Sequence, residues 1–180
     1  LTAWDNVFVE YADFAGDAMP RNGENAAREP GAYVDNSNRN DITSVKVIHD
    51  DTYVYFRVET LESVTEYASG DEGWMNLLIS AGDTETSFAG FNYIVNRHPG
   101  ENGFNWAEAG EAEIYRSENT LVYKIPLSAL GMTADNVSFS FKVADNVQFD
   151  MDKELNSHIL DYYISGDSAP IGRFGFAYNK

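Results

Sequence analysis

Short segments in which apolar and polar residues alternate are the feature that most constrains the fold of this chain. In TYVYFRVET (52–60), Val54, Phe56 and Val58 share one face of an extended strand, and mostly polar side chains occupy the other. VSFSFKV (137–143) repeats the pattern with Val and Phe at alternate positions. Because successive side chains of a strand point to opposite faces, this period of two predicts strands with one buried face.

Segments of this kind recur along the chain with turn residues between them, and no long amphipathic helical pattern interrupts them. They cover residues 7–11, 43–49, 52–60, 74–80, 91–97, 112–116, 121–125, 137–143 and 172–178. This series predicts an all-β fold, an antiparallel β-sandwich of jelly-roll or immunoglobulin-like two-sheet architecture, with residues 1–180 as a single domain. The chain starts at Leu1 without a methionine, so we expect it to be excised from a larger protein.

The chain is strongly acidic, with 12 Lys and Arg against 29 Asp and Glu and a formal net charge of −17. Such a field repels phosphate backbones and anionic headgroups, so we expect neither nucleic acid nor a membrane as a partner. It suits cations and neutral ligands, although acidity also serves solubility alone. The absence of cysteine excludes disulfides, thiolate metal sites and cysteine nucleophiles.

No catalytic motif stands out in the sequence. The three histidines, His49, His98 and His158, are isolated and lack the spacing of metal ligands. There is no nucleophile elbow, phosphate-binding loop or dinucleotide fingerprint. The 29 acidic residues offer many chance carboxylate pairs, so a glycosidase pair cannot be singled out. We expect the chain itself not to be an enzyme.

The stretch WMNLLISAGDTETSFAGFNYIVNR (74–97) carries the candidate binding face. Alternation places Met75, Leu77 and Ile79 towards the core, together with alternate residues of 91–95. The opposite face would then present an indole beside amides, which suits the apolar face and the hydroxyls of a sugar ring. The residues expected to bind carbohydrate are Trp74, Asn76, Asn92 and Asn96, with Arg97 and Trp106 at the rim. The alternative is that Trp74 covers the sheet edge or packs under the long segment 13–41.

Acidic and amide side chains cluster at several points outside the predicted strands. They occur at 39–41, at 145–152, and at Asp161 and Asp167. Oxygen ligands of this kind suit calcium, which takes six to eight oxygens, often from loops. We expect a calcium ion held by Asp41, Asp145 and Asp150, although Asp and Asn also dominate ordinary turns.

Several of these segments resemble the family 9-like carbohydrate-binding modules, which relate to the DOMON-type β-sandwiches. The resemblance covers nearly the whole chain and is carried by IHDDTYVYFRVET, WMNLLIS, GFNYIVNR, LVYKIPLSALG, FSFKVADN and YYISGDSAPIGRFGFAYN. It implies a non-catalytic sandwich that binds a polysaccharide or oligosaccharide through aromatic platforms and polar side chains, commonly with structural calcium.

The resemblance also implies an accessory role. Such modules are usually appended to secreted glycan-degrading enzymes, so the partner within the same chain would be the catalytic domain of a glycoside hydrolase or polysaccharide lyase. The expected location is then extracellular or at the cell surface. The alternative is a structural spacer domain of such an enzyme that has no sugar affinity of its own.

Overall fold

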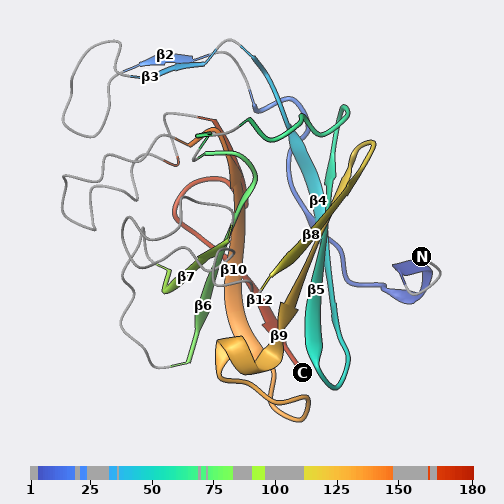
Figure 1. Ribbon diagram of the computed structural model, residues 1–180. Helices are drawn as coiled ribbons and strands as arrows, with labels where there is room; N and C mark the ends of the chain where they lie inside the picture. Colours follow the sequence, from blue (N-terminus) through green and yellow to red (C-terminus); the bar gives the residue numbers. More distant parts are fainter. Residues whose placement is uncertain are drawn as a thin grey trace.

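Two antiparallel β-sheets pack face to face in the computed structural model of this chain (Figure 1). The structure describes residues 4–18, 21–23, 33–35, 37–68, 70–71, 73–82, 91–95, 112–147, 162 and 166–180. This arrangement confirms the predicted all-β fold and the antiparallel β-sandwich. Among the described residues the helical segments are the 3-10 turns η1 (Trp4–Asn6) and η3 (Leu127–Leu130), and no helix is long and apolar enough to cross a membrane.

Each large sheet has five strands. Sheet 1 has the order β1-β4-β5-β9-β8, formed by β1 (Tyr11–Ala12), β4 (Ile42–His49), β5 (Tyr53–Thr60), β9 (Thr120–Pro126) and β8 (Glu113–Ser117). Sheet 2 has the order β11-β10-β6-β7 with β12 also paired to β10, formed by β11 (Asp167–Ala169), β10 (Ser138–Asp145), β6 (Asn76–Ala81), β7 (Tyr93–Val95) and β12 (Phe176–Asn179). A separate pair is formed by β2 (Arg21–Gly23) and β3 (Tyr33–Asp35).

The core between the sheets is built from the alternating positions that the sequence predicts. In β5, Val54, Phe56 and Val58 are fully buried, and every intervening residue is partly exposed. In β10, Phe139 and Phe141 face them, with ring centroids 5.5 and 5.2 Å from that of Phe56. Burial of these large aromatic and branched side chains drives the pairing of the two sheets.

β10 organises sheet 2 because both of its edges are paired. One edge pairs with β6, and the other is shared by β11, opposite residues 143–145, and β12, opposite residues 138–141. The C-terminal strand is in turn tied to the N-terminal part of the chain, since the Tyr11 hydroxyl donates to the Ala177 carbonyl at 2.8 Å. The last described segment therefore meets the first at one side of the sandwich.

A second apolar cluster covers the outer face of sheet 2. It consists of Leu78, Phe91, Ile94, Ala144, Val147 and Tyr162, all buried. Leu78 and Ile94 are register partners on β6 and β7 and point away from the main core. Both faces of this part of sheet 2 are therefore buried.

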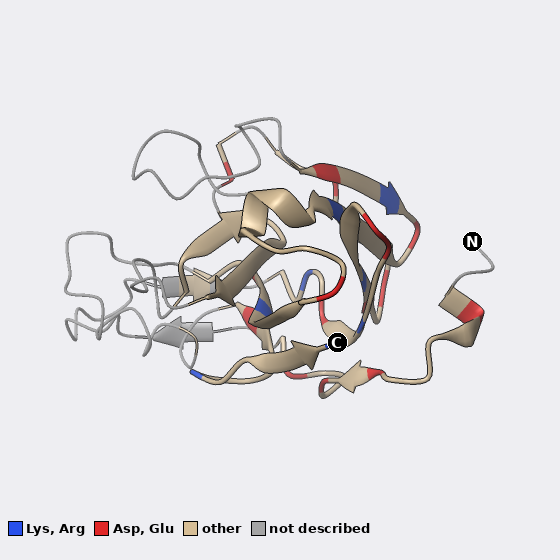
Figure 2. Ribbon diagram, turned by 90° about the horizontal axis from the view of Figure 1, so that it is seen from below, with Lys and Arg blue, Asp and Glu red and all other residues tan. Residues whose placement is uncertain are grey.

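Acidic residues are spread over the molecule. Figure 2 shows Asp and Glu in both sheets and in the segments that connect them. The acidic residues of the described part of the chain are thus not confined to one strand or one sheet.

Candidate metal centre

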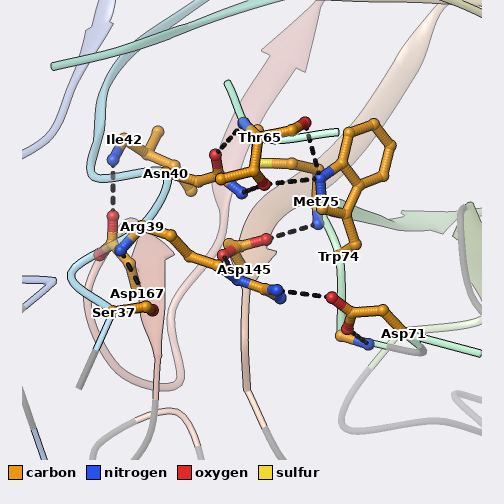
Figure 3. A network of polar contacts seen from close by, with 11 residues as sticks. Ser37, Arg39, Asn40, Ile42, Thr65, Asp71, Trp74, Met75, Asp145 and Asp167 are labelled. Atoms are coloured by element: carbon orange, nitrogen blue, oxygen red, sulfur yellow. Dashed lines mark hydrogen bonds and ion pairs between the residues drawn. The ribbon is translucent and has the colours of Figure 1, made fainter. Parts of the chain in front are cut away.

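The predicted aromatic platform, Trp74, lies inside the protein. Its side chain is 5% exposed and belongs to the main core. The indole Nε1 donates to the carbonyl of Thr65 at 3.1 Å and to its hydroxyl at 3.0 Å (Figure 3). The expectation that Trp74 stands on an open face is therefore wrong, because the indole packs in the main core.

The physical reason lies at Met75. This residue has a φ of 42°, in the left-handed region, and β6 begins only after it. The turn interrupts the alternation, so Trp74 and Met75 both enter the core instead of pointing to opposite faces.

The predicted amides do not form an open surface either. Asn76 is completely buried, which contradicts its expected exposure. Asn92 is half-buried, and its side chain accepts from the Ala81 N–H at 3.0 Å and donates to the Ala81 carbonyl at 2.9 Å. The Asn92 amide thus extends the ladder of β6 in place of a backbone partner. Asn96, Arg97 and Trp106 lie outside the described residues.

Asp145, one of the predicted metal ligands, is instead held by protein groups. Its side chain is fully buried, its Oδ2 accepts from Nε of Arg39 at 2.9 Å, and its Oδ1 accepts from the Met75 N–H at 2.8 Å (Figure 3). Burial raises the pKa of Asp145, and the Arg39 guanidinium opposes that rise. Arg39 also reaches Asp71 at 2.5 Å through Nη1. Asp145 is therefore the centre of an ion-pair network, and the expectation that it binds a metal is not supported by this geometry.

Three other carboxylates converge where the edges of the two sheets meet. Asp13 and Asp17 lie in the segment after β1, and Asp167 begins β11. One carboxylate oxygen from each lies within 4.8 Å of the others. These three residues, the carboxylate cluster, form a group that could hold a metal ion.

Backbone hydrogen bonds position this cluster. The Asp13 N–H donates to the Thr43 carbonyl at 2.9 Å, which fixes the segment after β1 against β4. Oδ2 of Asp167 accepts from the Ile42 N–H at 2.7 Å, which joins β11 of sheet 2 to β4 of sheet 1. The cluster therefore spans the junction between the sheets.

Asp41, the second predicted metal ligand, borders the cluster. Its Oδ2 accepts from the Gly16 N–H at 2.7 Å, and Gly16 lies in the loop between Asp13 and Asp17. The side chain is 7% exposed, and its other oxygen, Oδ1, is buried without a hydrogen-bond partner. An unsatisfied buried carboxylate oxygen is costly. Asp150, the third predicted ligand, lies outside the described residues.

The electrostatics of the cluster favour a cation. Burial, together with the charges of Asp17 and Asp41, raises the pKa of Asp13 to about 6. Burial and the charges of Asp17 and Asp13 raise the pKa of Asp167 to about 8. Carboxylates this close repel each other and take up protons more readily than isolated groups. A bound cation would remove this repulsion.

The ligand chemistry fits calcium better than a softer metal. Every donor in the cluster is a carboxylate oxygen. The neighbouring Asp41 has a further carboxylate oxygen that is buried without a hydrogen-bond partner. Hard divalent ions prefer such oxygens, whereas zinc and copper prefer imidazole or thiolate. The residues present therefore fit the calcium ion that the sequence predicts, and Asp41 borders the cluster without belonging to it.

Sequence reasoning missed Asp13 and Asp17. They stand four residues apart in an irregular acidic segment, and Asp167 lies far away in the sequence within GDSAP. Isolated Asp residues are common in turns, so a pattern search cannot select these three.

The chain as a whole has no match among models of known protein families, curated proteins or solved structures, so its function has to be inferred from the geometry of this site.

Proposed function

We propose that this chain is a calcium-binding, non-catalytic β-sandwich module in which the ion joins the two sheets. The observation that carries this proposal is the approach of carboxylate oxygens from Asp13, Asp17 and Asp167 to within 4.8 Å of one another. An ion coordinated by them would link the segment after β1 to β11, and so sheet 1 to sheet 2. Its role is structural, because Asp167 is 3% exposed and leaves little room for a substrate.

Calcium is the ion that this setting favours. It accepts six to eight oxygen ligands in flexible geometry, and the three carboxylates with Asp41 and backbone carbonyls can supply them. Extracellular calcium modules bind with a Kd of about 10⁻⁴–10⁻³ M. A site of that strength is filled outside cells, which agrees with the location that the resemblance to family 9-like modules implies.

Calcium titration of the metal-stripped chain tests this proposal. At a calcium concentration about a hundredfold above Kd, the ion adds about 2.7 kcal/mol of stability. For a chain of this size that raises Tm by about 5–10 °C. Isothermal titration calorimetry and a thermal melt with and without chelator measure the two effects.

Asp167→Asn is the critical variant, because the amide keeps an oxygen for the Ile42 N–H but loses the charge. We expect it to bind calcium at least about tenfold more weakly, in line with the loss of a charged ligand. Asp51→Asn is the matched control, since Asp51 is exposed in the β4–β5 turn and the change in charge is the same. Equal calcium affinity of the wild type and Asp167→Asn would contradict the site, and no calcium binding by the wild type would contradict the function.

Saccharide binding is the second candidate function, and a surface pocket on the outer face of sheet 1 favours it. The pocket has a volume of about 430 Å³ between η1 and the β8–β9 hairpin. Its wall includes Tyr115, which is 53% exposed, beside Arg57 and Asn119. An exposed aromatic ring next to guanidinium and amide groups supplies the stacking surface and hydrogen bonds that sugar rings use.

This second function would make the module an anchor that holds a glycan-degrading enzyme on its polysaccharide. Affinity gel electrophoresis over a panel of polysaccharides tests it with Tyr115→Ala. Tyr67→Ala is the matched control, because Tyr67 is 52% exposed and does not line the pocket. We expect retardation that Tyr115→Ala abolishes and Tyr67→Ala leaves unchanged. Absence of retardation on every polysaccharide would favour the spacer alternative, and retardation that survives in Tyr115→Ala would place the site elsewhere.

A further inference from the structure

One strand that the sequence predicts is formed only in part. The prediction covers residues 7–11, whereas β1 comprises only Tyr11 and Ala12, and residues 7–10 belong to no strand. In this segment the side chain of Phe8 is 93% exposed and that of Val9 is 57% exposed. These apolar side chains therefore add little to the packing of the sandwich in the position that the segment occupies here.

The edge of β4 next to this segment is open. On this edge β1 pairs Tyr11 with Val45 and Ala12 with Ser44, and among the described residues no strand pairs with β4 beyond that point. The Asp50 N–H donates to the Tyr53 carbonyl at 2.9 Å, on the opposite edge. Because backbone groups of successive residues alternate between the two edges, residues 47 and 49 direct their N–H and C=O groups to the open one.

A groove separates residues 6–9 from the open edge. Its volume is about 560 Å³, and its other walls are formed by residues 47–49 of β4 and residues 177–180 at the end of β12. Continuation of the β1 register would close the groove by pairing Glu10 with Lys46, Val9 with Val47 and Phe8 with Ile48.

The first of these pairs already exists. A carboxylate oxygen of Glu10 lies 3.2 Å from Nζ of Lys46, so the segment leaves β4 only after this point. Alternation would then direct Val7 and Val9 to the same side as Tyr11, whose ring packs against those of Phe141 and Phe176. The two valines would fill the groove from the core side.

The 3-10 turn η1 holds the segment away from β4. Trp4 is 8% exposed, and η1 forms one wall of the pocket that Arg57 and Tyr115 also line, on the side of sheet 1 away from sheet 2 (Figure 1). Arg57 lies opposite Lys46, in the middle of β4. Continuation of the register would instead carry Trp4 past His49 at the end of β4, at least about 10 Å further along the strand direction. Trp4 cannot occupy both places.

We propose that residues 4–10 form a strap with two positions, which Trp4 holds open in this structure and which closes by zipping residues 7–10 onto the free edge of β4. Closure exchanges the burial of one indole for the burial of Phe8, Val7 and Val9 and for new ladder hydrogen bonds. It also removes η1 from the pocket beside Tyr115, so any ligand that contacts η1 there favours the open position. This inference goes beyond the proposed function and does not depend on it.

Disulfide trapping tests the closed position directly, because the chain has no cysteine of its own. In the closed strap Phe8→Cys and Ile48→Cys lie opposite each other on one face, at a separation that a disulfide can span. Val9→Cys with Ile48→Cys is the matched control, because Val9 is the exposed neighbour of Phe8 but closure points it to the other face. We expect the first pair to form an intramolecular crosslink at least about tenfold faster than the second, measured on non-reducing gels and by peptide mass mapping.

Release of the anchor gives a second readout. Trp4→Ala added to the Phe8→Cys/Ile48→Cys chain should raise the crosslinking rate several-fold, whereas Tyr67→Ala removes an exposed aromatic ring away from the strap and should leave the rate unchanged. Equal rates for the two cysteine pairs would overturn the inference, and this comparison holds even if the Trp4→Ala chain does not fold by circular dichroism. A rate that a folded Trp4→Ala chain leaves unchanged would also overturn it. A disulfide between two chains in place of the intramolecular one would overturn it in favour of strand exchange between copies.

Discussion

Nε of Arg39 lies 2.9 Å from Oδ2 of Asp145, and the Asp145 carboxylate is completely shielded from solvent. The same carboxylate fixes the Met75 N–H at the start of β6. Arg39 precedes β4 in the sequence, so this pair connects the segment before β4 of sheet 1 with β10 and β6 of sheet 2. The pair organises the end of the sandwich next to the carboxylate cluster.

Arg39→Met should destabilise the protein strongly. The substitution leaves the Asp145 carboxylate buried without its cation, and loss of one member of a buried ion pair costs about 3–5 kcal/mol. Urea unfolding followed by circular dichroism measures the change. Arg57→Met is the matched control, because Arg57 pairs with Glu59 at 2.5 Å on the surface and should contribute no more than about 1 kcal/mol. Similar losses in the two variants would contradict the organising role of Arg39.

Tyr123→Phe should reveal a hydrogen bond across the core. The hydroxyl of this fully buried residue on β9 of sheet 1 donates to the Met75 carbonyl next to β6 of sheet 2, at 2.5 Å. Its removal leaves the carbonyl buried without this donor, which costs about 1–3 kcal/mol. Tyr55→Phe is the control, since its hydroxyl bonds Asp50 at the surface. An unfolding free energy that falls equally in both would contradict the importance of the Tyr123 bond.

Gly166→Ala should disrupt both the fold and calcium binding. Gly166 has a φ of +61°, and a Cβ on it would lie 2.0 Å from the Asp145 carbonyl oxygen, so the backbone before Asp167 would have to move. We expect a loss of several kcal/mol, more than the roughly 1 kcal/mol that a left-handed backbone alone costs alanine. Gly131→Ala separates the two effects, because its φ is +69° and nothing lies within 4 Å of the added Cβ. Equal melting temperatures of the two variants would contradict the predicted clash.

In the presence of chelator, stability should fall as the pH rises from about 4.5 to 6. In the folded state the pKa of Asp13 is raised to about 6 and that of Asp167 to about 8. In the unfolded state both carboxyl groups lose their protons at a lower pH, so rising pH favours unfolding. The slope is up to about 1.4 kcal/mol per pH unit for Asp167 and smaller for the half-buried Asp13, which solvent screens.

Other groups do not reverse this slope. The pKa of Asp50 is lowered, so its contribution to stability changes only at lower pH. The pKa of Lys142 is lowered to about 7, so this group stays charged in both states across the window. Asp167→Asn and saturating calcium should each flatten the slope in thermal melts. A melting temperature that rises with pH in chelator would contradict the electrostatics of the cluster.

The sandwich could be predicted because the alternation that indicates each strand lies within a few consecutive residues. Alternation in β5 and β10 identifies buried faces within a few residues, and the structure buries Val54, Phe56, Val58, Phe139 and Phe141 as expected. Such patterns depend on the strand itself and not on which strand it pairs with.

The exposure of the predicted sugar-binding residues was harder to predict, because it depends on what covers the outer face of each strand. The run NLLISA and the segment YIV contain consecutive apolar residues, a pattern typical of strands buried on both faces. That signal favoured a covered outer face over an open amide surface around Asn76. The left-handed turn at Met75 then brought Trp74 into the core. Such a turn cannot be recognised from the alternation of apolar and polar residues.

The link between Tyr11 and Ala177 has a consequence for how this protein folds. These residues are 166 positions apart, and the Ile42–Asp167 bond spans another 125. Contacts of such high sequence separation raise the contact order, which slows folding because the chain must close long loops before the contacts form. During synthesis the sandwich cannot be completed until β12 has left the ribosome. The junction that carries the carboxylate cluster needs β11 from the C-terminal part of the chain, so it forms late, and an ion bound there would act on a late step of folding.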